Sequence, residues 1–253
     1  MSWKKDNRIN EIIKLIVENE RMDVAELSDK LNVSQVTIRK DLNELEEKGI
    51  IQRSFGYAVI NNGDDISSRL AFHYNEKMMI ARKAAALVND HDTVIIENGS
   101  CCALLASILA TEKKDVTIIT NSAFIADYVR HCPSVNIILT GGLYQKDSQC
   151  LVGPGVAESI RNYHVRKMFI GTDGYHDTIG FTNKDPLRAQ SVKDMAASAD
   201  EVVVLTESAK FLMVGTIPLN LSASIKTVVT DSGIPVESTD SLSSHGIRVI
   251  ISN

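Results

Sequence analysis

Seven short runs rich in β-branched residues lie within residues 93–251, and stretches with helical character separate most of them. The runs cover residues 93–96, 116–120, 135–140, 167–170, 202–206, 226–230 and 247–251. The helical stretches cover residues 75–88, 102–110, 123–131, 154–161 and 187–199. Strands separated by helices of this length form a parallel sheet that is covered on both faces. The sequence therefore predicts a mostly parallel α/β domain in this part of the chain.

Small, hydroxylic and charged residues follow most of these runs, at the sheet edge where ligands of parallel sheets bind. They are Glu97-Asn98-Gly99-Ser100-Cys101, Asn121-Ser122, Gly141-Gly142, Gly171-Thr172-Asp173-Gly174, Glu207-Ser208-Ala209-Lys210 and Asp231-Ser232. Such residues before a helix let backbone N–H groups and the helix dipole face an anion such as phosphate, and Lys210 adds a positive charge. Each loop alone has an ordinary interpretation, because glycine and serine form turns and cap helices. Their recurrence predicts one shared pocket.

The segment 33–49 has the pattern of a capped amphipathic helix. At about 100° per residue, one side carries the apolar residues Ile38, Leu42 and Leu45. The other side carries Val36, Lys40, Asn43 and Glu47. Ser34 is the predicted N-cap, and Gly49 is the predicted residue just after the helix.

A shorter helix precedes this one, with Asp23 as its predicted cap and Val24, Leu27 and Leu31 on its apolar side. Between the two helices, Asn32-Val33 has room only for a tight turn. The pair is therefore a helix-turn-helix pattern. Its second helix can read a major groove if its first turn presents small polar and basic groups. An equally open interpretation is a surface helix whose charges are solvated.

The flanking segments complete the pattern of a winged helix. The residues Ile9, Ile12, Ile13, Ile16 and Val17 form an apolar stripe on a first helix, which closes a three-helix core. Residues 50–53 and 57–60 are predicted strands joined by a turn at 54–56. On this hairpin, Arg53 is either a DNA-phosphate contact or an ordinary exposed arginine.

Polar, turn-forming residues at 61–65 mark the domain boundary. We expect a winged helix-turn-helix domain at 1–60, a linker at 61–74 and an α/β domain at 75–253. The whole chain carries a net charge of -5, and residues 1–60 hold 10 Lys+Arg against 11 Asp+Glu. Any DNA contact must therefore depend on a local patch of Arg39, Lys40 and Arg53, rather than on overall charge.

The composition is that of an ordinary globular protein, with 44% hydrophobic and 23% charged residues. No apolar run approaches the roughly 18 residues of a membrane span, and residues 1–10 are too polar for a signal peptide. We therefore expect a cytoplasmic protein without a membrane partner. The four cysteines, at positions 101, 102, 132 and 150, lack metal-type spacing and are expected to be reduced thiols. We expect neither a metal nor a cofactor.

These motifs together resemble one family. The segment 33–42, followed by Leu45-Glu46-Glu47-Lys48-Gly49 and Arg53, resembles the winged helix of DeoR-type sugar-metabolism repressors. The family's sensor-domain signatures resemble, in the same order, Glu97-Asn98-Gly99-Ser100, Thr120-Asn121-Ser122, Gly141-Gly142, Val152-Gly153, Gly171-Thr172-Asp173-Gly174, Lys210-Phe211 and Thr230-Asp231. The resemblance spans residues 8–231. It implies a transcription factor whose sensor domain is similar to ribose-phosphate isomerases and binds a phosphorylated sugar, which changes operator affinity.

We therefore expect a repressor, dimeric or tetrameric, that binds a symmetric double-stranded operator. The expected DNA-phosphate contacts are Ser34, Thr37 and Arg53, and the expected base contacts are Gln35, Val36, Arg39 and Lys40. For the effector, a phosphate cradle is expected at Asn98, Gly99, Ser100 and Cys101. Hydroxyls or a second anionic group would be held by Asn121, Ser122, Asp173, Glu207 and Lys210, and Gly141 and Gly142 are placed at the same site.

Two other functions remain open from the sequence. One is a sugar-phosphate isomerase-like enzyme on the same α/β domain, for which Asp173, Asp177 and Glu207 supply candidate carboxylate bases. The other is a winged helix that binds a protein instead of DNA.

Overall fold

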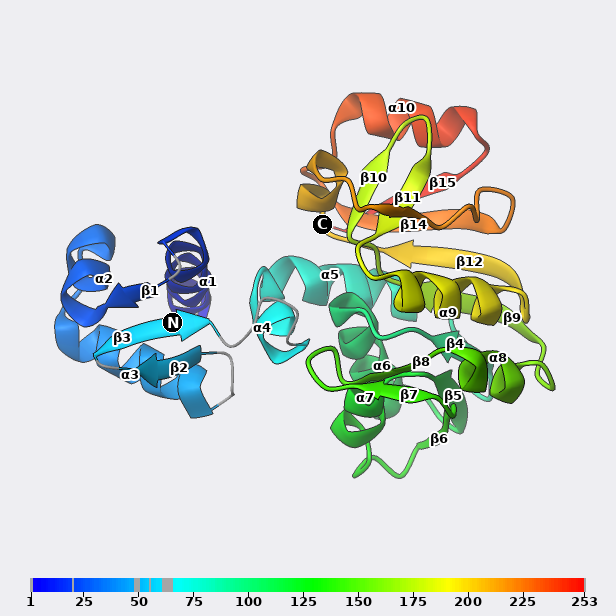
Figure 1. Cartoon of the computed structure of the whole chain (residues 1–253), viewed down its shortest axis with the longest axis horizontal. Coiled ribbons are helices and arrows are strands. Elements are labelled where there is room, and N and C mark those ends of the chain that lie inside the picture. The colour runs from blue at the N-terminus through cyan, green and yellow to red at the C-terminus, as the bar shows by residue number, and fades with distance from the viewer. Residues whose placement is uncertain (1, 20, 48–50, 55, 61–65, 253) are drawn as a thin grey trace. The chain divides into compact units, whose positions relative to one another are not determined.

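The computed structural model describes residues 2–19, 21–47, 51–54, 56–60 and 66–252. The chain divides into two compact units, Met1–Asn75 and Glu76–Asn253 (Figure 1). Each unit has its own hydrophobic core. None of the described helices is long and apolar enough to cross a membrane.

The first unit is built from three helices and a small antiparallel sheet. Its elements are α1 (Ser2–Asn19), β1 (Arg21–Asp23), α2 (Val24–Leu31), α3 (Gln35–Glu47), β2 (Ile51–Ser54), β3 (Tyr57–Ile60) and α4 (Ile66–Ala71). The predicted apolar faces of the three helices meet in its core, where Ile12, Ile16, Leu27, Ile38 and Leu42 are buried. The prediction of a three-helix core is confirmed.

Local hydrogen bonds set the geometry of the helix-turn-helix. Asp23 caps α2 by accepting a hydrogen bond from the Glu26 amide at 2.8 Å, and the Glu26 carboxylate accepts one from the Asp23 amide. Asn32 turns the chain in the left-handed region, with φ of 51°. Ser34 Oγ then accepts a hydrogen bond from the Thr37 amide at 3.2 Å, which makes it the N-cap of α3. Both predicted caps are therefore present.

The predicted wing is present as the antiparallel pair β2 and β3. The sequence did not predict β1, which adds a third strand on the other side of β3. Three residues are too few to show an alternating pattern, so only the pairing reveals this strand. The predicted helix end at Gly49, the first strand residue Ile50 and the turn residue Phe55 lie outside the described residues.

The segment 61–74, predicted to be a linker, contains the helix α4. Ile66 is fully buried, and Ala71 and Phe72 pack against the core of the first unit. The expected linker was inferred from the polar residues 61–65 alone. The apolar residues after them have enough surface to bury, and this favours a helix over an extended connection.

The second unit contains a parallel sheet of seven strands in the order β15-β14-β12-β9-β4-β5-β6. These strands are β4 (Thr93–Ile96), β5 (Val116–Thr120), β6 (Val135–Leu139), β9 (Val165–Ile170), β12 (Ala199–Leu205), β14 (Ile225–Asp231) and β15 (Arg248–Ser252). Each of the seven predicted runs corresponds to one strand. The predicted parallel α/β architecture is confirmed.

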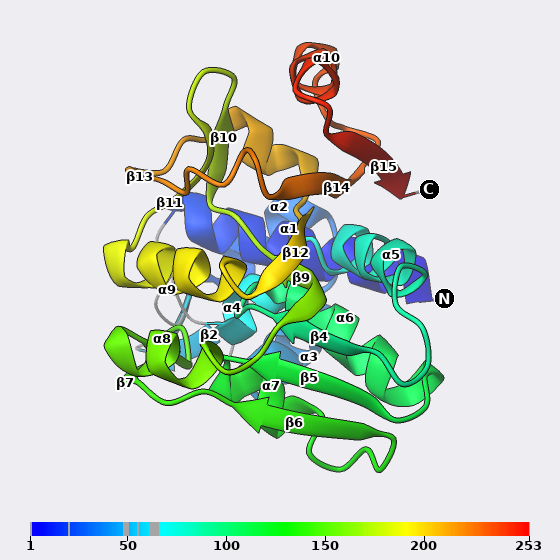
Figure 2. The same ribbon diagram turned by 90° about the vertical axis from the view of Figure 1, so that its right-hand side faces the viewer.

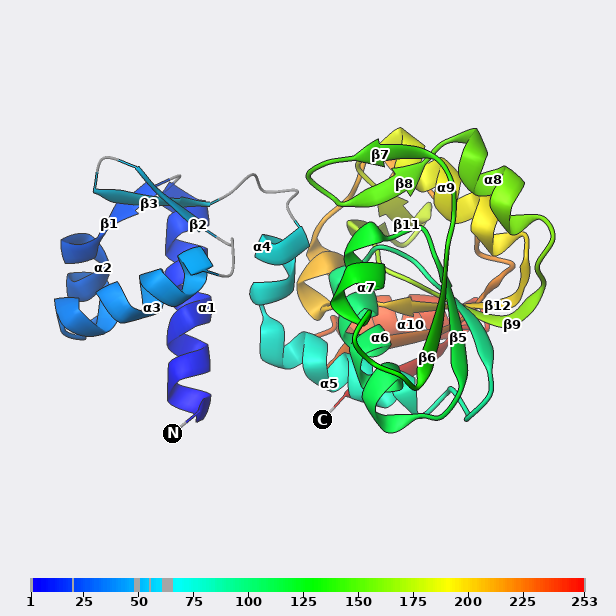
Figure 3. The same cartoon turned by 90° about the horizontal axis from the view of Figure 1, so that it is seen from below.

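Helices cover both faces of this sheet. They are α5 (Tyr74–Ala85), α6 (Ser100–Glu112), α7 (Ala123–Tyr128), α8 (Pro154–Ile160), α9 (Pro186–Ala196) and α10 (Val236–Ser244). Helices α6 and α9 lie on opposite faces, as two perpendicular views show (Figure 2 and Figure 3). Right-handed crossovers that run in opposite directions along a sheet place their helices in this way.

The direction in which the chain crosses the sheet changes between β4 and β9. From β4 the chain proceeds through β5 to β6, and from β9 it proceeds through β12 and β14 to β15 on the other side. Ligands of open α/β sheets bind at such a switch point, outside the carboxyl ends of the strands. The loops that begin at Glu97 and Gly171 flank it.

Several short elements were not predicted. They are the hairpin of β7 (Leu143–Gln145) and β8 (Cys150–Val152), the antiparallel sheet of β10 (Gly174–His176), β11 (Gly180–Asn183) and β13 (Ile217–Pro218), the 3₁₀ helix η1 (Ser208–Leu212), and α10. The rings of Tyr175, Phe181 and Phe211 contact one another and join η1 to this small sheet. We name these three rings the aromatic cluster.

Candidate functional site

Most of the predicted DNA contacts lie at the start of α3, where they face solvent. Gln35, Arg39 and Lys40 are exposed, and so is the capping residue Ser34, while Thr37 is half-buried. Val36 is 73% exposed, although its side chain is apolar. Ile38, Leu42 and Leu45 are buried in the core, whereas this valine lies outside it and contributes little to packing. An exposed methyl group on such a helix can contact the methyl group of thymine.

The basic side chains of this surface are held by local contacts. Arg39 Nη2 donates to Gln35 Oε1 at 3.2 Å, one helical turn away. Arg53 on the wing lies against the same helix, where its Nη2 donates to the Arg39 carbonyl at 3.1 Å and its Nε lies 3.7 Å from Glu46 Oε2. The structure thus brings Arg39 and Arg53 together as one patch, and a carboxylate lies beside it.

A partly buried ion pair joins α1 to α3. Arg8 on α1 donates two hydrogen bonds to Asp41 on α3, at 2.6 and 3.1 Å, and Asp41 is buried. The hydrogen bond to Asp41 raises the pKa of Arg8 further, and burial opposes this effect. The sequence interpretation missed both residues. The sequence did contain one indication of this pair, because Asp41 precedes Leu42 and lies on the apolar side of the helix.

In the second unit, two glycines meet at the switch point. A Cβ atom added to Gly99 would lie 3.1 Å from the Cα atom of Gly171, which is tighter than most packing contacts. Glu97 Oε2 accepts a hydrogen bond from the Gly171 amide at 3.1 Å and links the two loops. Gly99 is the N-cap of α6 and offers no capping side chain. The loops after β4 and β9 therefore form one continuous rim beside the start of α6.

A cluster of charged groups lies beside this rim. Lys77 on α5 and Glu207 after β12 are 2% and 6% exposed, and Lys77 Nζ lies 3.5 Å from Glu207 Oε1. Cys101 Sγ donates to Glu207 Oε2 at 3.9 Å. Burial raises the pKa of the Cys101 thiol, and the Glu207 carboxylate raises it further, while Lys77 and Lys210 oppose the shift. Cys101 is therefore a neutral thiol next to the Glu207 carboxylate.

Carboxylates at the strand ends hold the surrounding loops. Asp231 Oδ1 accepts a hydrogen bond from the Ser208 amide at 2.7 Å and positions η1, which carries Lys210. Asp173 Oδ2 accepts one from the Lys184 amide at 2.8 Å. Ser100 is the first residue of α6. These contacts show how the predicted residues near β4, β9 and β12 are placed.

The predicted residues after β5 and β6 have structural contacts of their own. Ser122 is buried and caps α7 by accepting a hydrogen bond from the Ile125 amide at 3.1 Å. Asn121 Nδ2 donates to the Leu151 carbonyl at 3.0 Å, and its buried Oδ1 atom has no partner in the described part of the chain. The helix-capping interpretation is thus confirmed for Ser122.

The glycine pair after β6 is packed against the β8–α8 segment. The Gly141 amide donates to Ser159 Oγ at 2.9 Å. Gly142 has φ of 140°, and a Cβ atom there would lie 2.7 Å from the Val152 carbonyl oxygen. The positive φ and the close approach of Val152 explain why residue 142 is glycine, whereas a methyl group at Gly141 would make only an ordinary contact. This loop therefore packs against β8 and α8, whereas the loops after β4 and β9 meet each other at the switch point.

Lys77 is the main residue of this cluster that the sequence interpretation missed. It occupies an apolar-stripe position of α5, followed at helical spacing by the buried residues Ile80, Ala81 and Ala84. A lysine in such a stripe requires a buried partner, because an isolated buried charge is strongly disfavoured. That spacing was the available signal, whereas the identity of the partner depends on the fold. Among the described residues, no three His, Cys, Asp or Glu side chains are grouped as a metal site.

Two family models match the chain. A model described as the DeoR-like helix-turn-helix domain matches residues 8–63, and one described as the DeoR C terminal sensor domain matches residues 72–232. Together they cover both units.

Curated relatives match over most of their length. The chain is 31% identical to the HTH-type transcriptional regulator GolR of Listeria innocua, over 90% of this chain and 91% of that protein. It is 31% identical to the HTH-type transcriptional regulator IolR of Bacillus subtilis, over 81% and 82%. It is 30% identical to the HTH-type transcriptional repressor GlcR of Bacillus subtilis, over 81% and 80%.

Among solved structures, ribose 5-phosphate isomerase A from Neisseria gonorrhoeae aligns with a TM-score of 0.40 and 13% identity. The alignment covers 54% of this chain and 52% of that one.

Proposed function

The chain belongs to the DeoR family of DNA-binding transcriptional regulators, and on this basis we propose that it represses a carbohydrate-utilisation operon under the control of a phosphorylated sugar or sugar alcohol. The name of the relative GlcR, a transcriptional repressor, supports the sign of regulation. Operator binding requires the compartment that holds the DNA, which in bacterial relatives is the cytoplasm.

The proposed operator contacts are the seven residues at the start of α3 and on the wing. Gln35, Val36, Arg39 and Lys40 read base edges, and Ser34, Thr37 and Arg53 contact phosphates. The exposure of Val36 supports this proposal most directly, because contact with a thymine methyl group would explain an apolar side chain on a polar helix face. A symmetric operator requires two copies of α3, so the protein acts as a dimer or tetramer.

The proposed effector site lies at the carboxyl ends of β4, β9 and β12. The single observation that carries it is the meeting of Gly99 and Gly171 at the switch point, next to the cluster of Lys77, Glu207 and Cys101. Glycine loops bring backbone N–H groups close to an anion, and lysines supply the opposite charge. Asn98, Ser100 and Cys101 complete the cradle for the phosphate.

The remaining polar residues of the proposed site bind sugar hydroxyls or a second anionic group. They are Asn121, Ser122, Gly141, Gly142, Asp173 and Glu207. The buried Oδ1 atom of Asn121 supports this part of the proposal, because a buried acceptor without a protein partner favours a hydrogen-bond donor from a ligand.

DNA binding is tested by fluorescence anisotropy with a labelled fragment from the promoter of the chain's own operon. We expect Arg39→Ala to weaken specific binding about tenfold or more, since one good base contact contributes about 1–3 kcal/mol. Arg161→Ala removes an exposed charge from the second unit and serves as the control. Equal affinity of Arg39→Ala and Arg161→Ala would remove Arg39 from the contact set. Binding that is independent of both sequence and salt would contradict operator reading altogether.

Effector binding is tested by calorimetry against a panel of sugar phosphates and the corresponding free sugars. We expect one phosphorylated compound to bind and to change operator affinity, while its unphosphorylated form does neither. Lys210→Ala should weaken the binding of that compound. Lys226→Ala, which changes an exposed lysine on β14, should leave its binding unchanged. If Lys210→Ala binds as tightly as the unaltered protein, Lys210 lies outside the site.

We assign no catalytic residue, because the curated relatives described above are named as regulators. The candidate carboxylates of the isomerase alternative have separate structural contacts. Asp173 accepts a hydrogen bond from the Lys184 amide, and Glu207 pairs with Lys77. Asp177 lies in the turn between β10 and β11.

A further inference from the structure

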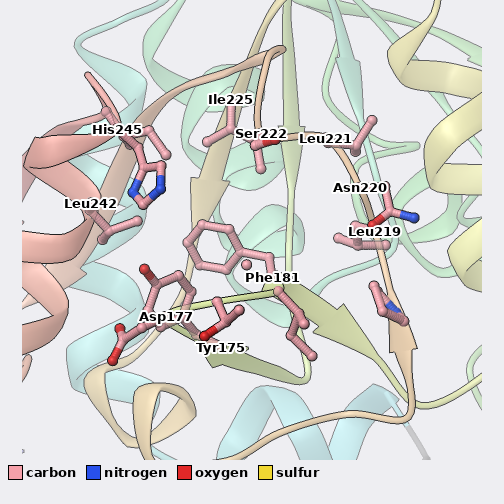
Figure 4. A pocket seen from close by; sticks show the side chains of 15 residues that line it. Tyr175, Asp177, Phe181, Leu219, Asn220, Leu221, Ser222, Ile225, Leu242 and His245 are labelled. Carbon is pink, nitrogen blue, oxygen red and sulfur yellow. The ribbon is translucent and has the colours of Figure 1, made fainter.

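A cavity of about 330 Å³ lies among the small sheet, the chain between β13 and β14, and α10 (Figure 4). Its lining includes Ile225, the first residue of β14, and Ile247, which immediately precedes β15. The cavity therefore lies toward the amino ends of these strands. The proposed effector site lies at the carboxyl ends of β4, β9 and β12, so the two are distinct.

The interior wall of the cavity is apolar. Tyr175 and Phe181 present aromatic rings, and Leu219, Ile225 and Leu242 add aliphatic side chains (Figure 4). All five residues belong to the close-packed core of the second unit. Packed interiors contain few voids larger than a water molecule, and small-molecule sites begin at about 300 Å³. The cavity is therefore large enough for a molecule with about one ring.

The polar groups around the cavity can form hydrogen bonds with a ligand, but they offer no lysine or arginine to pair with an anion. Asn220, Ser222 and His245 contribute an amide, a hydroxyl and an imidazole. His245 Nδ1 lies 2.7 Å from the Ser241 carbonyl and donates to it, which leaves Nε2 of the neutral ring able to accept a hydrogen bond. The lining contains no lysine or arginine and includes the carboxylate of Asp177. An anionic ligand would find no counter-charge here.

The walls of the cavity are fixed to each other. Tyr175 Oη lies 3.0 Å from Ser241 Oγ, and this hydrogen bond joins the small sheet to α10. Tyr175 and Phe181 also contact Phe211, the neighbour of Lys210 in η1. The hydrogen bond and the aromatic cluster thus connect the elements that form the walls of the cavity.

We infer that this cavity is a second small-molecule site, which takes an uncharged molecule with an apolar ring and a hydroxyl or carbonyl group. The ring packs against Tyr175, Phe181 and the aliphatic wall. The polar group bonds to Ser222, Asn220 or His245 at the rim. The inference is independent of the proposed effector, because it depends on neither the switch point nor a phosphate.

The test uses the full chain with ¹³C-methyl labels on leucine and isoleucine, and two probes with the same ring. 2-Phenylethanol carries a hydroxyl, and phenylacetate carries a carboxylate. We expect 2-phenylethanol to shift the methyl signals of Leu219, Ile225 and Leu242 in a saturable manner, and phenylacetate to bind at least tenfold more weakly. Equal binding of both probes would overturn the assigned ligand class.

A matched pair of variants locates the binding. Ser222→Phe places a ring at the rim, whereas Ala223→Phe adds the same ring at the next exposed position, which does not line the cavity. We expect Ser222→Phe to abolish the shifts and Ala223→Phe to retain them, with the remaining methyl spectrum unchanged in both. If the unaltered protein shows no saturable shift at these methyls, or if Ser222→Phe binds as well as Ala223→Phe, the site does not exist.

Discussion

Lys77 Nζ lies 3.5 Å from Glu207 Oε1, and both side chains are almost completely buried. The pair joins α5, the first helix of the second unit, to the end of β12, where the proposed effector site lies. Removing two charges from water is unfavourable, and their attraction in the interior offsets this only when the geometry is good. A buried pair of this kind therefore need not add much to stability, and we expect it to contribute to the proposed site instead.

Removing one charge of this pair should destabilise the second unit. Glu207→Leu leaves Lys77 buried without that carboxylate, and Lys77→Met leaves Glu207 without that ammonium, so for each we expect a loss of about 3–5 kcal/mol in the free energy of unfolding. The double variant Lys77→Met with Glu207→Leu should recover most of the loss, because neither charge remains. Urea unfolding of both single variants and the double variant measures the coupling. Additive losses would show that the pair does not act as a unit.

Operator binding should depend on the Arg8–Asp41 pair, although we place neither residue at the DNA. Asp41→Asn keeps the shape of the side chain and removes its charge, so α3 is held less firmly against α1. We expect about 2 kcal/mol lower stability of the first unit, since hydrogen bonds to charged groups contribute about 1.5–3 kcal/mol. Operator affinity in an anisotropy titration should fall as well.

The neighbouring pair of Lys5 and Glu44 is the control for this experiment. Its ammonium and carboxylate lie 2.5 Å apart, and the two side chains are 39% and 31% exposed, whereas Asp41 is buried. Exposed pairs typically contribute less than about 1 kcal/mol. Lys5→Met should therefore leave both stability and operator affinity nearly unchanged. An Asp41→Asn protein that binds the operator as well as Lys5→Met would show that the buried pair does not position the helix.

Adding one methyl group at the switch point should impair effector binding. In Gly99→Ala the new methyl would lie 3.1 Å from Gly171 Cα and 3.2 Å from Glu97 Oε2, so the two loops must separate. We expect weaker effector binding in calorimetry with a folded second unit. Arg161→Ala, an exposed change in the same unit and outside the proposed site, is the control. Equal loss in both variants would argue against a special role for the Gly99–Gly171 contact.

Thiol labelling should distinguish the four cysteines. Cys101, Cys102 and Cys150 are buried, and Cys132 is partly exposed. Because burial and Glu207 raise the pKa of Cys101, its thiolate stays scarce at neutral and mildly alkaline pH. We expect iodoacetamide at pH 8 to modify Cys132 first, and Cys132→Ser to remove the rapid phase. Rapid modification of Cys101, detected by mass spectrometry, would show that the charged cluster opens to solvent.

Regular elements were predictable where the chain repeats a local pattern. The runs at 93–96 and 116–120 match β4 and β5 residue for residue, because every residue in them is β-branched, which favours strands. The caps Asp23 and Ser34 were also predictable, because their hydrogen bonds reach only three residues along the chain. Strands of two or three residues such as β13 and β10 were missed, because they are defined by their partners rather than by their own sequence.

The sequence by itself determined the two units, the parallel sheet, the helix-turn-helix and the family, because periodicity, capping and short motifs are local. Only the tertiary structure decided which distant residues meet. It placed Gly171 against Gly99, Asp41 beside Arg8 and Lys77 beside Glu207. The physical reason is that a buried charge needs a partner and a glycine allows close approach of another backbone. Which residue takes that place depends on how the helices and strands pack. Sequence spacing shows that a partner is needed, and the packed sheet supplies it.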